Sequence, residues 1–417
     1  MKIALLTKEY PPHIYGGAGV HLEHLARELA RLENRQHSIN ILCFGEQQLT
    51  SDNTAVQGLS PEFAFPCQDL RHLKVFDVLL RNIVMAGVLQ EADILHCHTW
   101  YTHFAGCLLK QLMAVPLVLT THSLEPQRPW KAEQLGTGYK VAGWLEKTAY
   151  RNADGVIAVS GAMQQDVHAL YGVPFQKIRV IYNGIDTARY RPTPAPALLA
   201  DIGIDPAKPI LLFVGRITRQ KGIFHLIRAI DYLRPGLQIV LCACDPDTPE
   251  IGKEMADRVE QARAKTTNEI SWIDKFLSQD QIIALYSQAA LFVCPSIYEP
   301  FGIINLEAMA CSTPVVASAV GGIREVVTDP DTGRLVAFEP QDENNPEPQD
   351  PERFAQDLAA AINALIFDPE RLRLMGAKAR QRVEQHFSWT SIARQTLEFY
   401  RELTKPGGGY YSEHLKD

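Results

Sequence analysis

The chain has 417 residues, of which 46% are hydrophobic and 21% charged, so it is long enough for two domains with sizeable cores. Its formal net charge of −7 argues against a general nucleic-acid or membrane-surface binder, because such proteins carry a basic excess. The first apolar run, which ends at Thr7, is too short for a signal sequence or a membrane span. We therefore expect a cytoplasmic protein without nucleic-acid or membrane partners, and composition carries no signal for its oligomeric state.

Short apolar, β-branched runs alternate with helical patterns along the chain. This is typical of strands that helices cover on both faces. The predicted strands are 2–7, 38–45, 93–99, 116–122, 154–160 and 178–184 in the first half, and 209–215, 237–244, 270–274, 290–296, 314–318 and 333–338 in the second. Between them, residues such as Leu22, Leu25 and Leu29 recur at helical spacing. The alternation predicts an α/β protein with doubly wound parallel sheets.

The two halves share one plan, in which a strand leads through a Gly-containing turn into an amphipathic helix. A Pro-rich connector follows Asn183, so we place the domain boundary near residue 187, with a first domain 1–187 and a second domain 188–388. Ligands of doubly wound sheets bind beyond the carboxyl ends of the strands. Candidate functional residues are therefore sought at strand ends.

A strand-to-helix loop in the second half carries two carboxylates, Glu299 and Glu307, on either side of Phe301-Gly302. The backbone N–H groups of Gly302, Ile303 and Ile304 would crown the helix N-terminus, which is a natural site for phosphate. A sugar nucleotide needs such donors for its pyrophosphate and carboxylates for its hydroxyls. Glu307 alone could merely complement the helix dipole, but the pair of glutamates favours a ligand site.

Two cations, Arg216 and Lys221, lie at another strand end, between Gly215 and Gly222. They suit a diphosphate leaving group, whose developing negative charge must be neutralised. The alternative is a solvated basic loop. The flanking glycines favour close approach of the backbone to a ligand.

In the first half, a turn with Gly16 and Gly17 precedes the first long helix and allows the backbone to approach a phosphate or a sugar. It lacks the spacing of a dinucleotide fingerprint, which argues against a nicotinamide cofactor. His122 ends a buried strand and is expected to contact a sugar hydroxyl or a phosphate. In the following segment, Trp130 can stack on a glucose ring while Arg128 or Lys131 meets a phosphate; an ordinary exposed loop is the alternative.

Three further histidines, His96, His98 and His103, cluster near one strand end. No Asp or Glu accompanies them, so we expect no metal site there, and His96 can be a hydrogen-bonded core residue. Two Asp-Pro-Asp sequences, at 245–247 and 329–331, match a cation-binding pattern. Their prolines favour turns instead. We expect neither a metal nor a cofactor.

Together these residues resemble the retaining glycosyltransferases of family 4, and within it the bacterial glycogen synthases. The resemblance extends from LLTKEYPPHIYGGAGVH through GRITRQKG to YEPFGIINLEAMAC and VGGIREVV. It implies the GT-B architecture: two facing Rossmann-like domains, the active site in the interdomain cleft, and a final helix, 389–404, that joins the first domain. Better-known glycogen and starch synthases carry Lys-Thr-Gly-Gly-Leu where this chain has residues 14–18. The chain is instead similar to short actinobacterial-type enzymes, some of which make maltose 1-phosphate.

The resemblance also implies roles for the residues of the second half. Arg216 and Lys221 would bind the donor diphosphate, and Glu307 would accept hydrogen bonds from the ribose hydroxyls. Glu299 would face the transferred sugar. The backbone of Gly302, Ile303, Ile304 and Asn305 would contact phosphate and sugar.

In the first half, the resemblance places His122 beside the anomeric carbon and the turn of Gly16 and Gly17 near the phosphates. It implies metal-independent, retaining transfer of glucose from ADP-glucose to the non-reducing end of an α-1,4-glucan, with the departing phosphate accepting the acceptor's proton. Glucose 1-phosphate as acceptor is the alternative, and UDP-glucose stays open as donor. A sugar-nucleotide epimerase and a non-catalytic sensor on the same fold are further alternatives.

Overall fold

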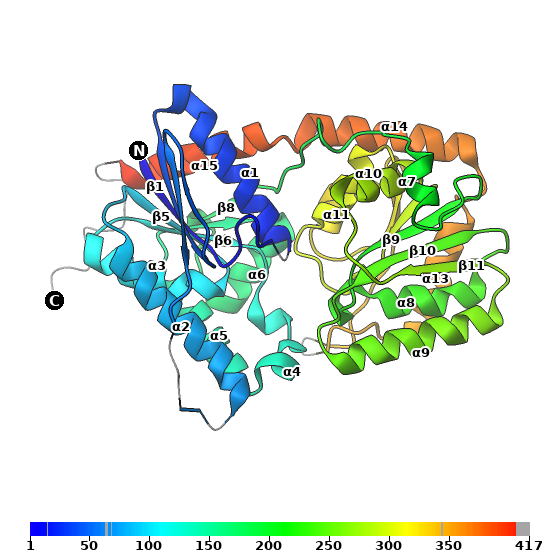
Figure 1. Ribbon diagram of the computed structural model, residues 1–417, viewed down its shortest axis with the longest axis horizontal. Coiled ribbons are helices and arrows are strands. Elements are labelled where there is room, and N and C mark those ends of the chain that lie inside the picture. Colours follow the sequence, from blue (N-terminus) through cyan, green and yellow to red (C-terminus); the bar gives the residue numbers. More distant parts are fainter. Residues whose placement is uncertain (15, 63–65, 68, 343–344, 406–417) are drawn as a thin grey trace. The chain divides into compact units, whose positions relative to one another are not determined.

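The computed structural model describes residues 1–14, 16–62, 66–67, 69–342 and 345–405 (Figure 1). The chain forms two compact units. The first comprises Met1–Asn183 together with the segment from Trp389 on, and the second comprises Gly184–Ser388. The division therefore falls after Asn183, a few residues before the position that the Pro-rich connector indicated.

The first unit contains a sheet of eight strands. Their order is β3-β4-β2-β1-β5-β6-β7-β8, and their bounds are β1 Lys2–Leu6, β2 Ser38–Phe44, β3 Gln48–Thr50, β4 Thr54–Leu59, β5 Ile94–His98, β6 Leu117–Thr121, β7 Gly155–Ala158 and β8 Ile178–Val180. All neighbours pair in parallel except β3 and β4, which form an antiparallel edge. The sheet is parallel as predicted apart from this one edge strand, which is antiparallel because a short turn rather than a helix joins it to β4.

Helices cover both faces of this sheet. They are α1 Gly17–Arg31, α2 Leu70–Val88, α3 His103–Met113, α4 Lys131–Leu135, α5 Gly138–Asn152, α6 Gly161–Tyr171 and α15 Trp389–Thr404, with 3-10 turns at Leu32–Arg35, Trp100–Thr102, Glu125–Gln127 and Phe175–Lys177. One core joins α1 and α15 to the strands: Leu22, Leu25 and Leu397 are buried with Ile3 and Ile39. The last helix thus packs within the first unit, although the second unit precedes it in the chain.

The second unit contains a parallel sheet of six strands, in the order β11-β10-β9-β12-β13-β14. The bounds are β9 Ile210–Arg216, β10 Gln238–Cys244, β11 Glu269–Ile273, β12 Leu291–Cys294, β13 Val315–Ser318 and β14 Gly333–Val336. In both sheets the chain winds outward in one direction and then returns to the middle to wind the other way. Such a sheet is doubly wound, as predicted.

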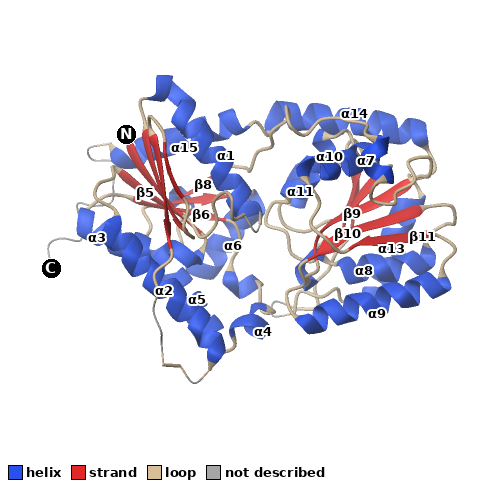
Figure 2. Ribbon diagram, in the orientation of Figure 1, coloured by secondary structure: helices blue, strands red, loops and turns tan. Residues whose placement is uncertain are grey.

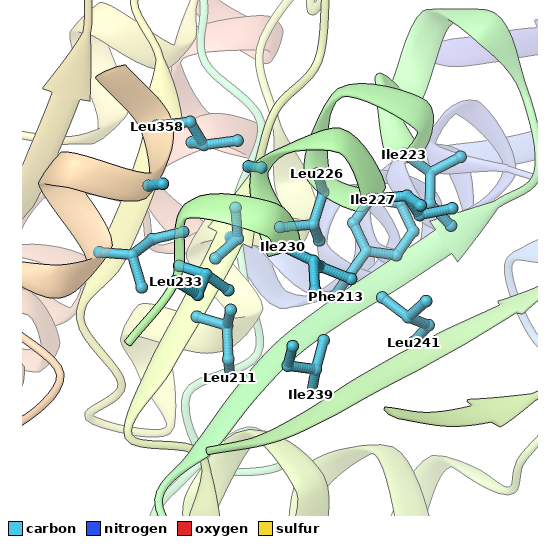
Figure 3. Close-up of a cluster of buried hydrophobic side chains, with 14 of the residues drawn as sticks. Leu211, Phe213, Ile223, Leu226, Ile227, Ile230, Leu233, Ile239, Leu241 and Leu358 are labelled. Atoms are coloured by element: carbon cyan, nitrogen blue, oxygen red, sulfur yellow. The ribbon is translucent and has the colours of Figure 1, made fainter. Parts of the chain in front are cut away.

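The helices of the second unit form a layer on each side of its sheet, with α8, α9 and α13 on one side and α7, α10 and α11 on the other (Figure 2). Their bounds are α7 Pro196–Ala200, α8 Ile223–Ala229, α9 Pro249–Lys265, α10 Gln279–Gln288, α11 Ile303–Ala310, α12 Ile323–Val326, α13 Pro351–Asn363 and α14 Pro369–His386, with 3-10 turns at Arg219–Lys221 and Ile230–Tyr232. Figure 3 shows Phe213 of β9 and Leu241 of β10 in one cluster with Leu226 of α8 and with Ile230 of the 3-10 turn that follows it.

Three helix starts in the second unit use the same sequence signal. Thr248, Asp350 and Asp368 each accept a hydrogen bond from a backbone N–H of the first turn, and a proline follows each of them. This combination caps the helix and fixes the first backbone angle. Within the described ranges, every helix is too short or too polar to cross a membrane.

Candidate active site

The sheet of the second unit brings two of the predicted loops to one place. β9 and β12 are neighbours, although β10 and β11 lie between them in the chain. The winding direction therefore reverses between β9 and β12, and ligands of doubly wound sheets bind beyond the strand ends at such a switch point. Arg216 is the last residue of β9, and Glu299 lies in the loop after β12.

Backbone contacts hold these two loops together. The Ile297 N–H donates to the Gln220 carbonyl at 3.0 Å. Gly222 has φ +64°, and a Cβ there would collide with the carbonyl of Pro295. Glycine is needed because the backbone is left-handed and the strand end lies so near. The close approach predicted at Gly222 is therefore made to the chain's own backbone.

Lys221 and Glu299 form an ion pair across the two loops. The Lys221 Nζ lies 2.7 Å from the Glu299 Oε2, and the Ser296 hydroxyl donates to the same oxygen at 3.4 Å. Burial by itself would lower the pKa of Lys221, but the attraction and hydrogen bond of Glu299 outweigh it and raise that pKa. The two residues carry their charges side by side in a partly buried place.

Arg216 is held by two carboxylates at the end of the neighbouring strand β10. Its Nε donates to Asp245 Oδ2 at 2.9 Å, and its Nη2 donates to Asp247 Oδ1 at 2.7 Å. Both aspartates lie in the loop between β10 and α9, as the Asp-Pro-Asp sequence predicted. Their pairing with Arg216 could not be predicted from the sequence. The other Asp-Pro-Asp sequence, 329–331, forms a turn, as predicted.

Glu307 lies in the second turn of α11 and accepts two tyrosine hydroxyls. Tyr190 donates to its Oε1 at 3.1 Å, and Tyr286 donates to its Oε2 at 3.0 Å. Burial raises the pKa of Glu307 to about 7, although both hydrogen bonds and Lys221 act in the opposite direction. The carboxyl group is therefore oriented at both oxygens and titrates near neutrality. Neither tyrosine was singled out from the sequence.

The N-terminus of α11 offers backbone donors near these side chains. Gly302 precedes the helix with φ +98° and gives it no side-chain cap, while Ile303 and Ile304 supply its first N–H groups. Asn305 is fully buried, and its side-chain amide has no hydrogen-bond partner among the described residues. A Cβ on Gly302 would collide with that amide. This start of a helix, with a buried amide beneath it, is suited to an anion.

In the first unit, the glycine turn lies after β1. Gly16 precedes α1, and Gly17 is the first residue of that helix. The Gly16 N–H donates to the Glu9 carboxylate at 2.8 Å. The amide expected near a phosphate is thus bonded within the chain in this structure.

His122 follows β6 directly and lies in a cluster of imidazoles. Its Nε2 is 3.0 Å from the Nδ1 of His98, and its ring centroid is 4.8 Å from that of His21. Burial, reinforced by the neighbouring imidazoles, lowers the pKa of His122 and of His98 well below the ordinary value. His96 bonds to Tyr400 and to Thr120, which confirms its interpretation as a hydrogen-bonded core residue.

Sequence reasoning missed His21, which comes from α1 and has only its place on the buried helix face as a signal. One nitrogen from each of His21, His98 and His122 lies within 4.8 Å of the other two, the one such group of possible metal ligands in the described part of the chain. Three imidazoles can hold Zn²⁺ or a similar cation. His103 lies outside this group, fully buried, and burial lowers its pKa to about 3.

These features define a class of protein. A doubly wound sheet carries cations, a buried amide and an oriented carboxylate at its switch point, which suits an enzyme that transfers a group from a nucleoside diphosphate. A model of Glycosyltransferase Family 4 matches residues 15–189, and a model of Glycosyl transferases group 1 matches residues 196–346.

Individual relatives match over nearly the whole chain. An alpha-maltose-1-phosphate synthase of Mycolicibacterium smegmatis is 45% identical over 410 residues, which cover 97% of this chain and 100% of the relative. A glycogen synthase of Mycobacterium tuberculosis is 29% identical over 430 residues, covering 96% and 94%. The solved structure of a sucrose-phosphate synthase from Thermosynechococcus elongatus superposes with a TM-score of 0.74 at 26% identity, covering 96% and 98%.

The chain belongs to glycosyltransferase family 4. It has the GT-B architecture of two α/β domains with parallel sheets, and it is a hexosyltransferase. The prediction of the fold and of the enzyme class is confirmed.

Proposed function

We propose that the chain is an alpha-maltose-1-phosphate synthase, which transfers glucose from ADP-glucose to glucose 1-phosphate. The observation that carries the proposal is the identity of 45% with a protein of that name over the full length of both chains. The relative named glycogen synthase reaches 29%. We therefore propose glucose 1-phosphate, the alternative acceptor of the sequence analysis, in place of the α-1,4-glucan.

The second unit is proposed to bind the donor. Arg216 and Lys221 lie at the switch point of its sheet and would exchange their carboxylate partners for the diphosphate. The N–H groups of Ile303 and Ile304 would complete the phosphate site. Cations and dipoles fixed before the reaction stabilise a leaving group without reorganising in the transition state.

The carboxylates of the second unit would hold the two sugars of the donor. Glu307, oriented by Tyr190 and Tyr286, would accept from the ribose hydroxyls. Glu299, next to Lys221, would face the transferred glucose, with Asn305 beneath the start of α11. A buried amide has both donors and an acceptor, so it can bond a sugar hydroxyl and a phosphate oxygen.

The first unit is proposed to present the acceptor, with His122 beside the anomeric carbon and Gly16 and Gly17 near the phosphates. The neutral His122 would accept a hydrogen bond from a sugar hydroxyl. The imidazole of His122 is neutral because burial and the neighbouring imidazoles disfavour its protonated form.

The reaction is proposed to retain the configuration at the anomeric carbon. The bond from that carbon to the departing phosphate oxygen breaks, and a bond to O4 of the acceptor forms on the same face. The departing phosphate takes the proton from O4, so the products are ADP and maltose 1-phosphate. No step requires a metal ion, and we propose none.

The test measures diphosphate release from ADP-glucose or UDP-glucose, each with glucose 1-phosphate, a maltooligosaccharide, glycogen or no acceptor. Release from ADP-glucose that requires glucose 1-phosphate, with maltose 1-phosphate as the product, would support the proposal. Release that requires a glucan would make the chain a glucan synthase. Turnover of the donor without an acceptor would favour an epimerase, and donor binding without release a sensor.

A further inference from the structure

We propose that Arg128 binds the phosphate of the acceptor, and that Ser123 and Glu125 hold its guanidinium near His122. The inference rests on the proposed function, because it identifies the group by which that site would recognise a sugar phosphate rather than a neutral glucan. From the sequence alone, Arg128 and Lys131 were equal candidates for contact with a phosphate.

In the loop after β6, Arg128 bonds back to two earlier residues of the same loop. The Arg128 Nη1 donates to the Ser123 hydroxyl at 3.0 Å and to the Glu125 Oε1 at 3.2 Å. Ser123 is the residue next to His122 in the chain. The guanidinium is therefore tied to the residue that follows the imidazole which the proposed function places at the reacting carbon.

This loop is fixed from below by a buried polar network. The Glu125 N–H donates to Oε2 of Glu146 on α5 at 2.8 Å, and the hydroxyl of Tyr171 on α6 donates to the same oxygen. The Tyr139 hydroxyl donates to the Glu125 carbonyl. Glu125 and Glu146 are 2% and 1% exposed. Two helices of the first unit thus anchor the residue that orients Arg128.

Stability alone is a poor reason for this arrangement. Burying a carboxylate costs desolvation energy that one ion pair does not reliably recover, and an apolar pair of similar size often stabilises a fold as well. The Arg128 side chain keeps 19% of its surface exposed while that of Glu125 is buried. A buried carboxylate that holds one nitrogen of a partly exposed guanidinium is the arrangement expected of a preorganised anion site.

The position also fits the shape of the acceptor. In glucose 1-phosphate, the reacting O4 and the phosphate lie at opposite ends of one sugar ring. The phosphate must therefore be bound about one ring away from the reacting carbon, and Arg128 bonds to Ser123, the residue next to His122 in the chain. A guanidinium is planar and carries five N–H groups, which suit phosphate oxygens better than the point charge of a lysine.

The experiment compares acceptors that differ only in the phosphate. With ADP-glucose as donor, kcat/KM is measured for glucose 1-phosphate and for glucose in the wild type, in Arg128→Gln and in Arg151→Gln. Arg151 is an exposed residue of α5 outside the loop and provides the matched control. We expect Arg128→Gln to reduce the ratio of the two kcat/KM values about 10- to 100-fold, the size of a charge-assisted hydrogen bond. Arg151→Gln should leave it unchanged, and an unchanged ratio in Arg128→Gln would overturn the proposal.

A second variant tests the positioning role of Glu125. Glu125→Gln keeps the shape and removes the charge, so KM for glucose 1-phosphate should rise by a larger factor than kcat falls. Equal losses of kcat with both acceptors, at unchanged KM, would show that the pair is merely structural and would overturn the proposal.

Direct binding separates this inference from the proposed function. Glucose 1-phosphate is titrated calorimetrically into protein saturated with ADP. Binding that Arg128→Gln weakens at least tenfold and Arg151→Gln preserves would support the phosphate site even if the wild type formed no maltose 1-phosphate. Normal formation of maltose 1-phosphate together with equal binding by all three proteins would leave the proposed function intact and refute the role of Arg128.

Discussion

The affinity of the second unit for a nucleotide sugar should fall below neutral pH because of Glu307. Burial raises the pKa of this carboxyl group to about 7. Its ionised form accepts hydrogen bonds at both oxygens, whereas the protonated form loses part of that capacity. If the ribose hydroxyls donate to Glu307, the donor binds the ionised form better, and its dissociation constant rises as the pH falls through 7.

The size of the effect follows from proton linkage. Each pH unit below the pKa reduces the ionised fraction about tenfold, so the dissociation constant at pH 5 should be about 100 times that well above pH 7. Calorimetric titration of ADP-glucose without an acceptor measures it between pH 5 and 9. ADP-glucose is preferable to ADP, because a terminal phosphate itself titrates near pH 6.

Two variants sharpen the interpretation. Glu307→Gln should bind ADP-glucose more weakly and without pH dependence in this range. Tyr286→Phe removes a hydrogen bond that lowers the pKa of Glu307, so it should move the midpoint of the profile to higher pH. A wild-type profile as flat as that of Glu307→Gln would refute the assignment of Glu307 to the ribose.

Three further predictions concern other parts of the site. Arg216→Ala or Lys221→Ala should reduce turnover roughly 10²- to 10³-fold, the cost of losing a transition-state donor, whereas Arg219→Ala in the same loop should stay near the wild-type rate; near-normal turnover of both former variants would contradict the assignment. EDTA should leave the rate of diphosphate release unchanged and added Zn²⁺ should inhibit it by occupying the histidine cluster, with His21→Gln at least tenfold less sensitive; loss of activity in EDTA would show that a metal is required. Gly222→Ala should lower the free energy of unfolding in urea by about 1–3 kcal/mol, since it forces a side chain into a left-handed backbone against Pro295, and an unchanged midpoint would contradict that contact.

Much of the fold can be predicted from the sequence because its strands are buried on both faces. Runs such as Ile210–Arg216 are continuously apolar over most of their length, and all twelve predicted strands are present, with ends that differ by a few residues. β3 and β4 were missed. β3 has three exposed residues, and β4 mixes polar and small residues with apolar ones, so neither produces the apolar run of a strand covered on both faces.

The positions of the candidate residues at strand ends could be predicted, but their partners could not. Arg216 meets Asp245 because β9 and β10 are neighbours, and Glu307 meets Tyr190 across 117 residues of chain. Such pairs depend on the order of the strands in the sheet and on the path of the connecting loops. Neither can be read directly from a single sequence. His21 was missed for the same reason, since a helix brings it to the ends of β5 and β6.

The charges at the switch point indicate what the second unit selects. Arg216 and Lys221 contribute two positive charges, and their partners Asp245, Asp247 and Glu299 contribute three negative ones. The site is therefore not expected to bind anions in general, because an incoming diphosphate must displace the carboxylates that already form ion pairs with the two cations.

A phosphate alone gains little from that exchange, whereas a nucleotide sugar adds hydrogen bonds from its ribose to Glu307 and from its glucose to Glu299. We therefore expect inorganic pyrophosphate to bind at least 100-fold more weakly than ADP-glucose, about two or three hydrogen bonds at roughly 1–1.5 kcal/mol each. Competitive titration against ADP-glucose measures the difference. Equal affinities would mean that the phosphate groups dominate binding. They would also mean that breaking the ion pairs of Arg216 and Lys221 with their carboxylates costs little free energy. A large difference would mean that recognition of the two sugars supplies the free energy that opens the ion pairs, so that the cations face a diphosphate only when a complete donor is bound.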